Sequence, residues 1–408
     1  MTKHVAVALL LVAVALAWCT VANAGEAGTF GDDLAFLKKH TDALVLSDKS
    51  GAAQVAVVPL YQGRVMTSTA GGPEGTSYGW INRKLVALGQ RQPQFNALGG
   101  EDRMWLGPEG GQFSIYFPKG ASEKFDFKDW LVPAPIDWGG WDVVEKGQSS
   151  AHFRKAFSLT NVSGTKLDIV ADRTVRLLEP ADVKKHFGVE LPATLKAVAY
   201  ESDNNVKNAG DKAWERATGT VSIWILCMYN PSPATTIVIP YVQGPEDKLG
   251  PIVNDTYFGK VPAERLKVKD GIIYFNADGK NRGKIGLSPL RAKPILGSYD
   301  AANRVLTLAT YTKPEGVTDY VNSMWEIQKA PFAGDVVNSY NDGPNPEGKR
   351  MGNFYELETS SPAAALQPSQ SLTHVHTTAH FQGPQAELDK LAQAALGVSL
   401  AEIQAAMK

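Results

Sequence analysis

The chain has 408 residues with 41 basic and 42 acidic side chains, so its formal net charge is −1. It has no basic stripe and no block of like charge, which argues against nucleic acid or an anionic membrane surface as a partner. Aromatic residues are plentiful, with nine Trp, 13 Tyr and 15 Phe. Most are expected in the core, while exposed rings would suit a sugar-binding cleft.

The first 24 residues are typical of a cleaved secretory signal. Lys3 precedes an apolar run over residues 5–17, which is shorter than the roughly 20 residues that a bilayer-spanning helix needs. A small-x-small cleavage pattern then ends at Ala24. We expect residues 1–24 to be removed and residues 25–408 to fold as a single domain in the periplasm or outside the cell, without membrane insertion.

The two cysteines agree with this expectation. Trp18 disfavours a lipoprotein anchor at Cys19, because such signals need a small residue before the cysteine. Cys19 would then leave with the signal, so Cys227 has no partner for an intrachain disulfide. Its apolar neighbours predict a buried thiol. A large hydrophobic core must therefore hold the fold together.

Helical periodicity is confined to the two ends of the mature chain. Residues 32–40 place acidic side chains first and basic side chains last, as the helix dipole favours. Residues 386–396 are rich in Ala and Leu, and Ser399 with Glu402 three residues later forms a capping-box pattern. C-terminal helices are therefore expected over about residues 386–408.

Strands dominate between these ends. Residues 221–229 form a dense apolar run that should be buried on both faces, and three more segments have strand character: residues 235–241, 304–312 and 320–328. The basic residues 280–286 lack the glycine spacing of a phosphate-binding loop, which favours a β-hairpin. Together these patterns predict a mostly β fold, an enlarged many-stranded sandwich with short terminal helices.

The early residues 96–113 combine glycine, charge and an aromatic ring. Glycine at positions 99 and 100 would let the backbone approach a ligand closely. Arg103 offers a forked donor for hydroxyls or a carboxylate, and Trp105 offers a stacking surface. A tight loop with an ordinary ion pair is the alternative. The candidate substrate contacts of this segment are Glu101, Asp102, Arg103 and Trp105.

Two later segments carry further polar candidates. A similar mixture recurs at residues 338–344, where Asn341 and Asp342 are candidate substrate contacts. In the following strand, alternation puts Glu356 and Glu358 on one face, a pair that suits proton transfer or completes a metal site. A solvated strand face is the alternative for this pair.

The most unusual segment is residues 373–381, which holds three of the seven histidines. In an extended strand His374, His376 and His380 project from one face, opposite an apolar face that suits a core. Such histidines can bind a transition metal or supply acid and base near neutral pH; a polar solvent face is the alternative. If the strand with the two glutamates lies beside this one, carboxylates and imidazoles would line one cavity.

These segments, in this order, resemble the galactose mutarotase-like (aldose 1-epimerase-like) β-supersandwich, and most closely an uncharacterised bacterial secreted branch of it. The resemblance rests on residues 99–103 with the Gly-Pro-Glu-Gly-Gly stretch after them, and on residues 357–359 with the last strand. It implies a sugar bound on a concave face. It also implies that Glu358 is the base, with Glu356 as a near competitor, and that Arg103 binds the substrate.

One departure from the family pattern concerns the general acid. Mutarotases place an acid histidine in the middle of the chain, and here no histidine occurs between His186 and His374. The acid role is then missing, or it passes to the histidine cluster or to Tyr340. His374 and His376 are the first candidates, and His380 is assigned to substrate binding. Simple mutarotation is therefore in doubt.

The expected function is an exported carbohydrate-active protein that moves a proton at a bound sugar, as epimerases, mutarotases and polysaccharide lyases do. The alternative is a non-catalytic carbohydrate-binding protein that uses the same cleft. Neither requires a cofactor. A divalent metal held by His374, His376 and Glu356 is a third hypothesis.

Overall fold

The structure is a computed structural model that describes residues 28–121, 125–345 and 347–408. The predicted signal at residues 1–24 lies outside these residues. The described chain is built mainly from β-strands in three sheets, and neighbouring strands pair antiparallel throughout. The predicted mostly β fold is confirmed.

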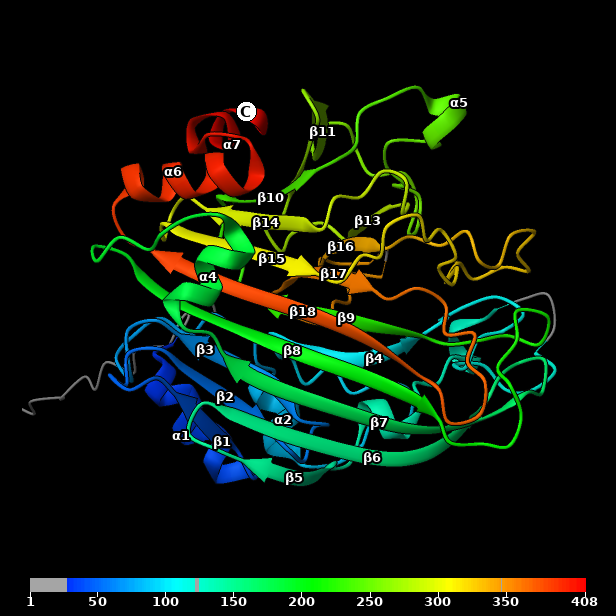
Figure 1. The fold of residues 1–408 in the computed structure, drawn as a ribbon. Coiled ribbons are helices and arrows are strands. Elements are labelled where there is room, and N and C mark those ends of the chain that lie inside the picture. Colours follow the sequence, from blue (N-terminus) through cyan, green and yellow to red (C-terminus); the bar gives the residue numbers. More distant parts are fainter. Residues whose placement is uncertain (1–27, 122–124, 346) are drawn as a thin grey trace, which may run out of the picture.

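The largest sheet forms one layer of the molecule and lies in front in Figure 1. In order across the sheet, its ten strands are β11 (Leu266–Lys269), β12 (Ile272–Asn276), β10 (Thr235–Pro240), β14 (Ile295–Asp300), β15 (Val305–Tyr311), β18 (Ser371–Gln382), β8 (Lys196–Asn208), β7 (Lys166–Leu177), β6 (Ser150–Thr160) and β5 (Asp142–Lys146). The strand expected over residues 304–312 is β15, and the one expected over residues 235–241 is β10.

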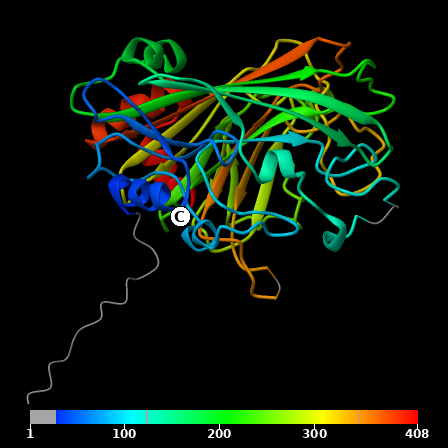
Figure 2. The same cartoon turned by 90° about the horizontal axis from the view of Figure 1, so that it is seen from below.

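The opposite layer combines the two smaller sheets. The five-stranded sheet has the order β13 (Gly283–Leu287), β16 (Val337–Asn341), β17 (Tyr355–Ser360), β9 (Ser222–Tyr229) and β4 (Arg103–Gly107). The three-stranded sheet has the order β1 (Leu44–Ser47), β2 (Gln54–Val58) and β3 (Arg64–Thr69). A single bridge between Val65 and Asp102 links β3 to β4. Figure 2 shows the two layers from below.

The main hydrophobic core fills the space between the layers. On β7, buried side chains such as Leu167, Ile169 and Val175 alternate with partly exposed ones, as expected for a strand with one face on the core. Strand β9 is buried along its whole length because the ten-stranded sheet covers one face and loops cover the other. Its Cys227 is buried as predicted and forms no disulfide within the described residues.

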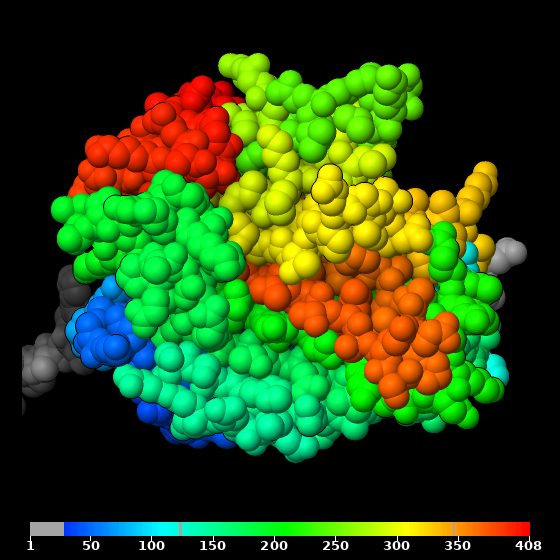
Figure 3. Space-filling model, viewed as in Figure 1, coloured from blue at the N-terminus to red at the C-terminus, as the bar shows by residue number. Residues whose placement is uncertain are grey.

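Helices occupy the ends of the chain and several connections. They are α1 (Phe30–His40), α2 (Arg83–Leu88), the 3-10 helix η1 (Phe127–Asp129), α3 (Ala134–Asp137), α4 (Pro180–Phe187), α5 (Glu246–Leu249), α6 (Gln385–Leu396) and α7 (Leu400–Ala406). The terminal helices are confirmed, including the capping box of Ser399 and Glu402. In Figure 3, α6 and α7 form the red mass at one end of the large sheet. Within the described ranges no helix is long and apolar enough to cross a membrane.

The sequence patterns failed in three places. Helices were expected only at the ends, yet α4 forms mid-chain, beginning with Pro180 and a capping box between Glu179 and Asp182. Residues 280–286 do not form a hairpin, because β13 pairs with the distant β16. Residues 320–328 form no strand, because the Gln328 side chain folds back onto the carbonyls of Asn322 and Met324 and closes a loop.

Candidate functional site

The five-stranded sheet turns one face toward the ten-stranded sheet and the other face away from it. On β17, the Tyr355 hydroxyl contacts Ser298 of β14 at 2.8 Å, so Tyr355 faces the large sheet. Strand alternation then points Glu356 and Glu358 away from it, onto what we call the outer face. Cross-strand register places six chemically notable side chains on this face, the outer-face cluster: Arg103, Trp105, Trp224, Lys284, Glu356 and Glu358.

One half of the cluster is an ion pair over an indole ring. The Arg103 Nη2 atom donates to Glu356 Oε1 at 2.8 Å, and both side chains are almost fully covered, with 4% and 7% of their surfaces exposed. The Arg103 guanidinium lies 4.4 Å from the centre of the Trp105 ring, a cation–π distance. Residues at opposite ends of the sequence therefore meet here, as the sequence interpretation required.

The other half of the cluster surrounds Glu358. Its Oε2 atom accepts hydrogen bonds from Lys284 Nζ at 2.8 Å and from Trp224 Nε1 at 3.0 Å. The Lys284 ammonium also lies 4.8 Å from the centre of the Trp224 ring. A fixed cation and an indole N–H thus hold one oxygen of Glu358, while Oε1 has no hydrogen-bond partner among the described residues.

Burial shifts the proton affinity of the acids at this site. It raises the pKa of Glu356, against the opposing pull of Arg103. It also raises the pKa of Glu109, next to Lys284, to about 7. Burial lowers the pKa of Lys284, but the carboxylates of Glu358 and Glu109 outweigh this effect and raise it above its ordinary value. Acids that exchange protons near neutral pH are therefore concentrated here.

Several buried polar atoms on the outer face have no partner among the described residues. They are Nε and Nη1 of Arg103, Nε1 of Trp105, Oγ of Ser222 and Oε1 of Glu358. Buried polar groups are nearly always hydrogen-bonded, so a group of unpaired donors and acceptors on one face calls for explanation. A ligand rich in hydroxyl groups would satisfy both kinds of atom.

Two connected loops cover this face. One carries Glu109 and the other carries Trp325, and Gln112 and Gln328 join them through reciprocal bonds of 3.0 Å. Gly110 is required at the contact, because a Cβ atom there would collide with the Met324 carbonyl. Aromatic rings line the covered side, with Phe95 edge-on to Trp105 at 5.3 Å. The cluster thus lies beneath these two joined loops.

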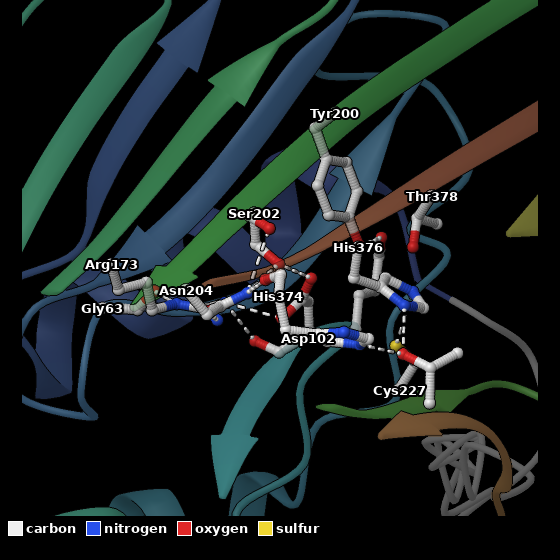
Figure 4. Close-up of polar contacts among 12 residues, drawn as sticks. Gly63, Asp102, Arg173, Tyr200, Ser202, Asn204, Cys227, His374, His376 and Thr378 are labelled. Atoms are coloured by element: carbon white, nitrogen blue, oxygen red, sulfur yellow. Dashed lines mark hydrogen bonds and ion pairs between the residues drawn. The ribbon is translucent and has the colours of Figure 1, made fainter. Parts of the chain in front are cut away.

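The histidines are inward-facing but do not share this space. His374 Nε2 and His376 Nδ1 both contact the Thr359 hydroxyl, at 3.0 and 2.9 Å, and His376 Nε2 lies 3.5 Å from Cys227 Sγ (Figure 4). They therefore occupy the space between the sheets, on the opposite face of β17 from Glu356. The expectation that imidazoles and carboxylates line one cavity was wrong, because Glu356 and Glu358 point to the face of β17 opposite the one that meets the histidines.

Burial also determines the charge of these two histidines. It lowers the pKa of His374 to about 3 and that of His376 to about 4, so both are neutral near pH 7. A solvent-exposed face, the alternative considered from sequence, is excluded because neither side chain is exposed. Within the described residues no group of three His, Cys, Asp or Glu side chains is arranged to hold a metal. Glu356 cannot complete a metal site with these histidines, because it points to the other face.

The glycine-rich stretch directs its acids inward. At Gly99 and Gly100 φ is +94° and +116°, and Gly99 packs directly against the Trp80 carbonyl rather than leaving space for a ligand. Asp102 pairs with Arg173 of β7 at 2.7 Å in the interior (Figure 4). Glu101 also points into the space between the sheets, so neither acid reaches the outer face.

The remaining candidates lie at the rim of the five-stranded sheet. Tyr340 shares the outer face with Glu356, and its hydroxyl donates to Asp342 at 2.7 Å. Burial raises the pKa of Tyr340 well above its ordinary value, which disfavours it as an acid near neutral pH. Asn341 points the other way and holds a turn, accepting from the Gly279 N–H at 2.9 Å.

Sequence patterns alone missed Lys284, Trp224 and Glu109. Lys284 lies in a segment expected to be an exposed basic hairpin, and Trp224 in a run expected to be plain core. The available signals concerned only two of them, a lysine between Gly283 and Ile285 and an indole within a buried run, whereas Glu109 lies in the loop after β4. Neither signal indicates a site until the sheet order is known.

Three solved structures are similar to this chain. A protein from Synechocystis sp. PCC 6803 is 12% identical, with a TM-score of 0.49, and the match covers 83% of this chain and 96% of that one. A galactose mutarotase-like protein from Lactobacillus casei ATCC 334 is 8% identical, with a TM-score of 0.46 and coverages of 83% and 100%. A galactose mutarotase related enzyme from Lactobacillus acidophilus is 7% identical, with a TM-score of 0.44 and coverages of 83% and 97%.

All three structures are 12% identical or less to this chain, and their TM-scores lie below 0.5. A search of curated proteins finds no match to the chain. One family matches almost the whole described chain, over residues 28–407, and it is a family of unknown function (DUF6786).

Proposed function

The chain belongs to this family of unknown function (DUF6786), and we propose that it binds a carbohydrate at the outer-face cluster and moves a proton at a sugar carbon or ring oxygen. The observation that carries the proposal is the set of unpaired donors and acceptors on Arg103, Trp105, Ser222 and Glu358, which are buried together on one face. A sugar ring presents hydroxyl groups that both donate and accept, so it can satisfy them all.

The rings around these atoms favour the same class of ligand. Trp105 and Trp224 lie edge-on to each other at 5.8 Å, next to the two cations of the cluster. Flat indole faces suit the apolar C–H faces of a sugar ring, while the charged groups suit its hydroxyls. A fatty acyl chain would use these groups less completely, because it carries no hydroxyl groups.

The charges support a division into base and acid. Glu358 is held by Lys284 and Trp224 through Oε2, which leaves Oε1 available to accept a proton. Glu109, whose pKa burial raises to about 7, can donate a proton near neutral pH. We therefore propose Glu358 as the base and Glu109 as the acid, with Glu356 positioning Arg103. This replaces the acid role that the sequence suggested for the histidines.

Access to the cluster requires the covering loops to move. Arg103 and Lys284 expose only 4% and 11% of their side chains, so a sugar cannot reach them without displacing the cover. Lids that close over a substrate exclude water and strengthen the electrostatic contacts beneath them. Export to the periplasm or beyond the cell remains part of the proposal, since it rests on residues 1–24.

The test separates binding from turnover. Purified protein is screened against neutral and acidic mono- and oligosaccharides, by calorimetry for binding and by NMR for anomer exchange, solvent deuterium uptake and chain cleavage. In Glu358→Gln we expect turnover to fall by roughly 10²-fold or more, with binding largely kept, and in Glu356→Gln we expect weaker binding. Glu264→Gln, at an exposed position remote from the cluster, should match the parent.

The alternative function is a carbohydrate-binding protein without catalysis. Its support is the strength of the closed ion pairs, which hold Arg103 and Glu358 without a substrate. Binding without turnover in the parent protein would favour this alternative. Absence of any sugar binding would overturn both.

A further inference from the structure

A second hollow lies away from the outer face, where β18 ends. A cavity of about 340 Å³ opens between the loop after β3, the start of β8, the β14–β15 turn and the end of β18. A smaller cavity of about 40 Å³ lies further inside, and Thr76 and Asn303 line both. The two therefore form an outer chamber and an inner chamber of one recess.

Three side chains at the inner chamber form a continuous polar relay. Thr307 lines the chamber, and its Oγ1 atom lies 2.9 Å from His380 Nδ1. His380 Nε2 lies 3.2 Å from Glu101 Oε2, and both of these side chains are fully buried. The order carboxylate, imidazole, hydroxyl is the one that orients and polarises a hydroxyl group in nucleophilic sites.

The Glu101 carboxylate, at the end of the relay away from the chamber, is held by further hydrogen bonds. Glu101 Oε2 accepts from the Ser68 hydroxyl at 2.8 Å and from the Tyr200 hydroxyl at 3.1 Å. The His380 ring is stacked on Tyr78 with 4.3 Å between ring centres. The imidazole is thus fixed in orientation, and it lines the inner chamber together with the Thr307 hydroxyl. None of these residues touches the outer-face cluster.

The outer chamber has a different character. Lys196 and Arg304 are exposed at its wall, opposed by the single acid Glu74, so the wall carries an excess of positive charge. Gln382 stands between the chambers on weak bonds, with Oε1 at 3.4 Å from both the Thr76 and Tyr78 hydroxyls. Its Nε2 atom also donates to the Asn303 carbonyl at 3.3 Å.

We propose that this recess is a second ligand site, for a small hydroxylated anion of monosaccharide size. Lys196 and Arg304 hold the anionic group at the outer chamber, and Thr307, oriented by His380 and Glu101, contacts a ligand hydroxyl at the inner chamber. Sugar acids and sugar phosphates share this chemistry. The proposal does not depend on the function assigned to the outer face.

The experiment follows His380 directly. Protein labelled with ¹⁵N-histidine is titrated separately with sodium galacturonate, galactose 1-phosphate and neutral galactose, and the imidazole resonances are recorded by NMR. The His380→Gln variant assigns the signal. We expect at least one of the two anions to shift the His380 signal saturably, more tightly than galactose does. The stronger of the two identifies a carboxylate or a phosphate as the anionic group.

A second set of variants tests the site without disturbing the fold, because the charged side chains at the outer wall are exposed. Lys196→Glu and Arg304→Glu should each weaken the anion titration by roughly threefold or more. Lys267→Glu, an exposed change on β11 outside the recess, should leave it unchanged. No saturable shift with either anion, or a shift that both wall variants leave unaltered, would overturn the proposal.

Discussion

At the scale of single residues, burial determines which side chains of this protein carry charge. Glu109 and His376 illustrate opposite signs of the same effect. Loss of water disfavours the carboxylate of Glu109 and raises its pKa to about 7, and it disfavours the imidazolium of His376 and lowers its pKa to about 4. Glu109 can therefore exchange a proton near neutral pH, whereas His376 stays neutral there.

The neutral histidine makes the fold sensitive to mild acid. Because the folded-state pKa of His376 lies below its ordinary value of 6.5, the unfolded chain binds the extra proton as pH falls through about 6.5. Stability is therefore lost on acidification, by about 2 kcal/mol for this group between pH 7 and pH 5. His376→Gln should lose that much less than the parent over the same interval, measured by urea unfolding at both pH values.

A control for this pH effect is available on the protein surface. His40→Gln removes an imidazole that is partly exposed at the end of α1, and it should leave the loss between pH 7 and pH 5 unchanged. An equal acid sensitivity in His376→Gln and the parent would contradict the assignment of a neutral, buried imidazole.

Residue-level patterns correctly predicted which side chains share a face of a strand. They were less successful in predicting which other strands those side chains meet. Alternation correctly placed Glu356 with Glu358, and His374 with His376, on common faces. It could not show which face of β17 meets β18, so the two pairs were expected in one cavity. Pairing between strands distant in sequence is decided by packing of the whole core, which a local pattern does not contain.

At the scale of elements, the cover of the outer face depends on a few specific bonds. Gln112→Ala removes both reciprocal bonds to Gln328, so the two loops should separate more readily. We expect the amides of residues 322–328 to exchange hydrogen about thirtyfold faster, since the two lost bonds contribute about 1 kcal/mol each. Hydrogen exchange followed by mass spectrometry measures this directly.

The same change carries a consequence for binding. If the loops are the entrance, association of a sugar with Gln112→Ala should be faster than with the parent protein. Gln90→Ala, at an exposed position, is the matched control. Unchanged exchange in residues 322–328 would show that other contacts hold the cover.

The terminal helices seal the outer surface of the large sheet. Leu391 of α6 is 2% exposed and packs in a cluster with Leu306, Leu308 and Phe381 of the sheet. Leu391→Ala should lower the free energy of unfolding by about 2–5 kcal/mol, because it leaves a cavity in that cluster. Lys390→Ala, at the exposed neighbouring position, should change it by no more than about 0.5 kcal/mol. Chemical denaturation distinguishes the two.

Helices whose ends are marked by a capping or charge pattern in the sequence were predicted well. Segments whose conformation depends on distant partners were not. The charge order of residues 32–40 and the capping box at Ser399 are local signals, and both helices formed where expected. Residues 320–328 alternate like a strand, but their backbone groups find partners in the Gln328 side chain and in Pro331 instead of a neighbouring strand. Local periodicity cannot reveal such competition.

At the scale of the whole molecule, a buried ion pair connects the two layers. Asp102, next to β4, and Arg173, on β7, are both fully buried at 2.7 Å. Arg173 also donates to the Gly63 carbonyl and to Asn204. The pair thus joins the smaller sheets to the large one, in the same space between the layers as His374 and His376 (Figure 4).

A double-mutant cycle tests what this connection contributes. Asp102→Asn leaves a buried cation without its counter-charge, and Arg173→Met leaves a buried carboxylate, so each should cost about 3–5 kcal/mol in urea unfolding. The double variant leaves neither charge, and its cost should be smaller than the sum of the two by at least about 2 kcal/mol. The exposed pair Lys166 and Asp168, on the same strand β7, should show a coupling of no more than about 1 kcal/mol under the same substitutions. Additive costs at the buried pair would mean that the layers are held by apolar packing alone, since two charges that stabilise each other across the core cannot be removed independently.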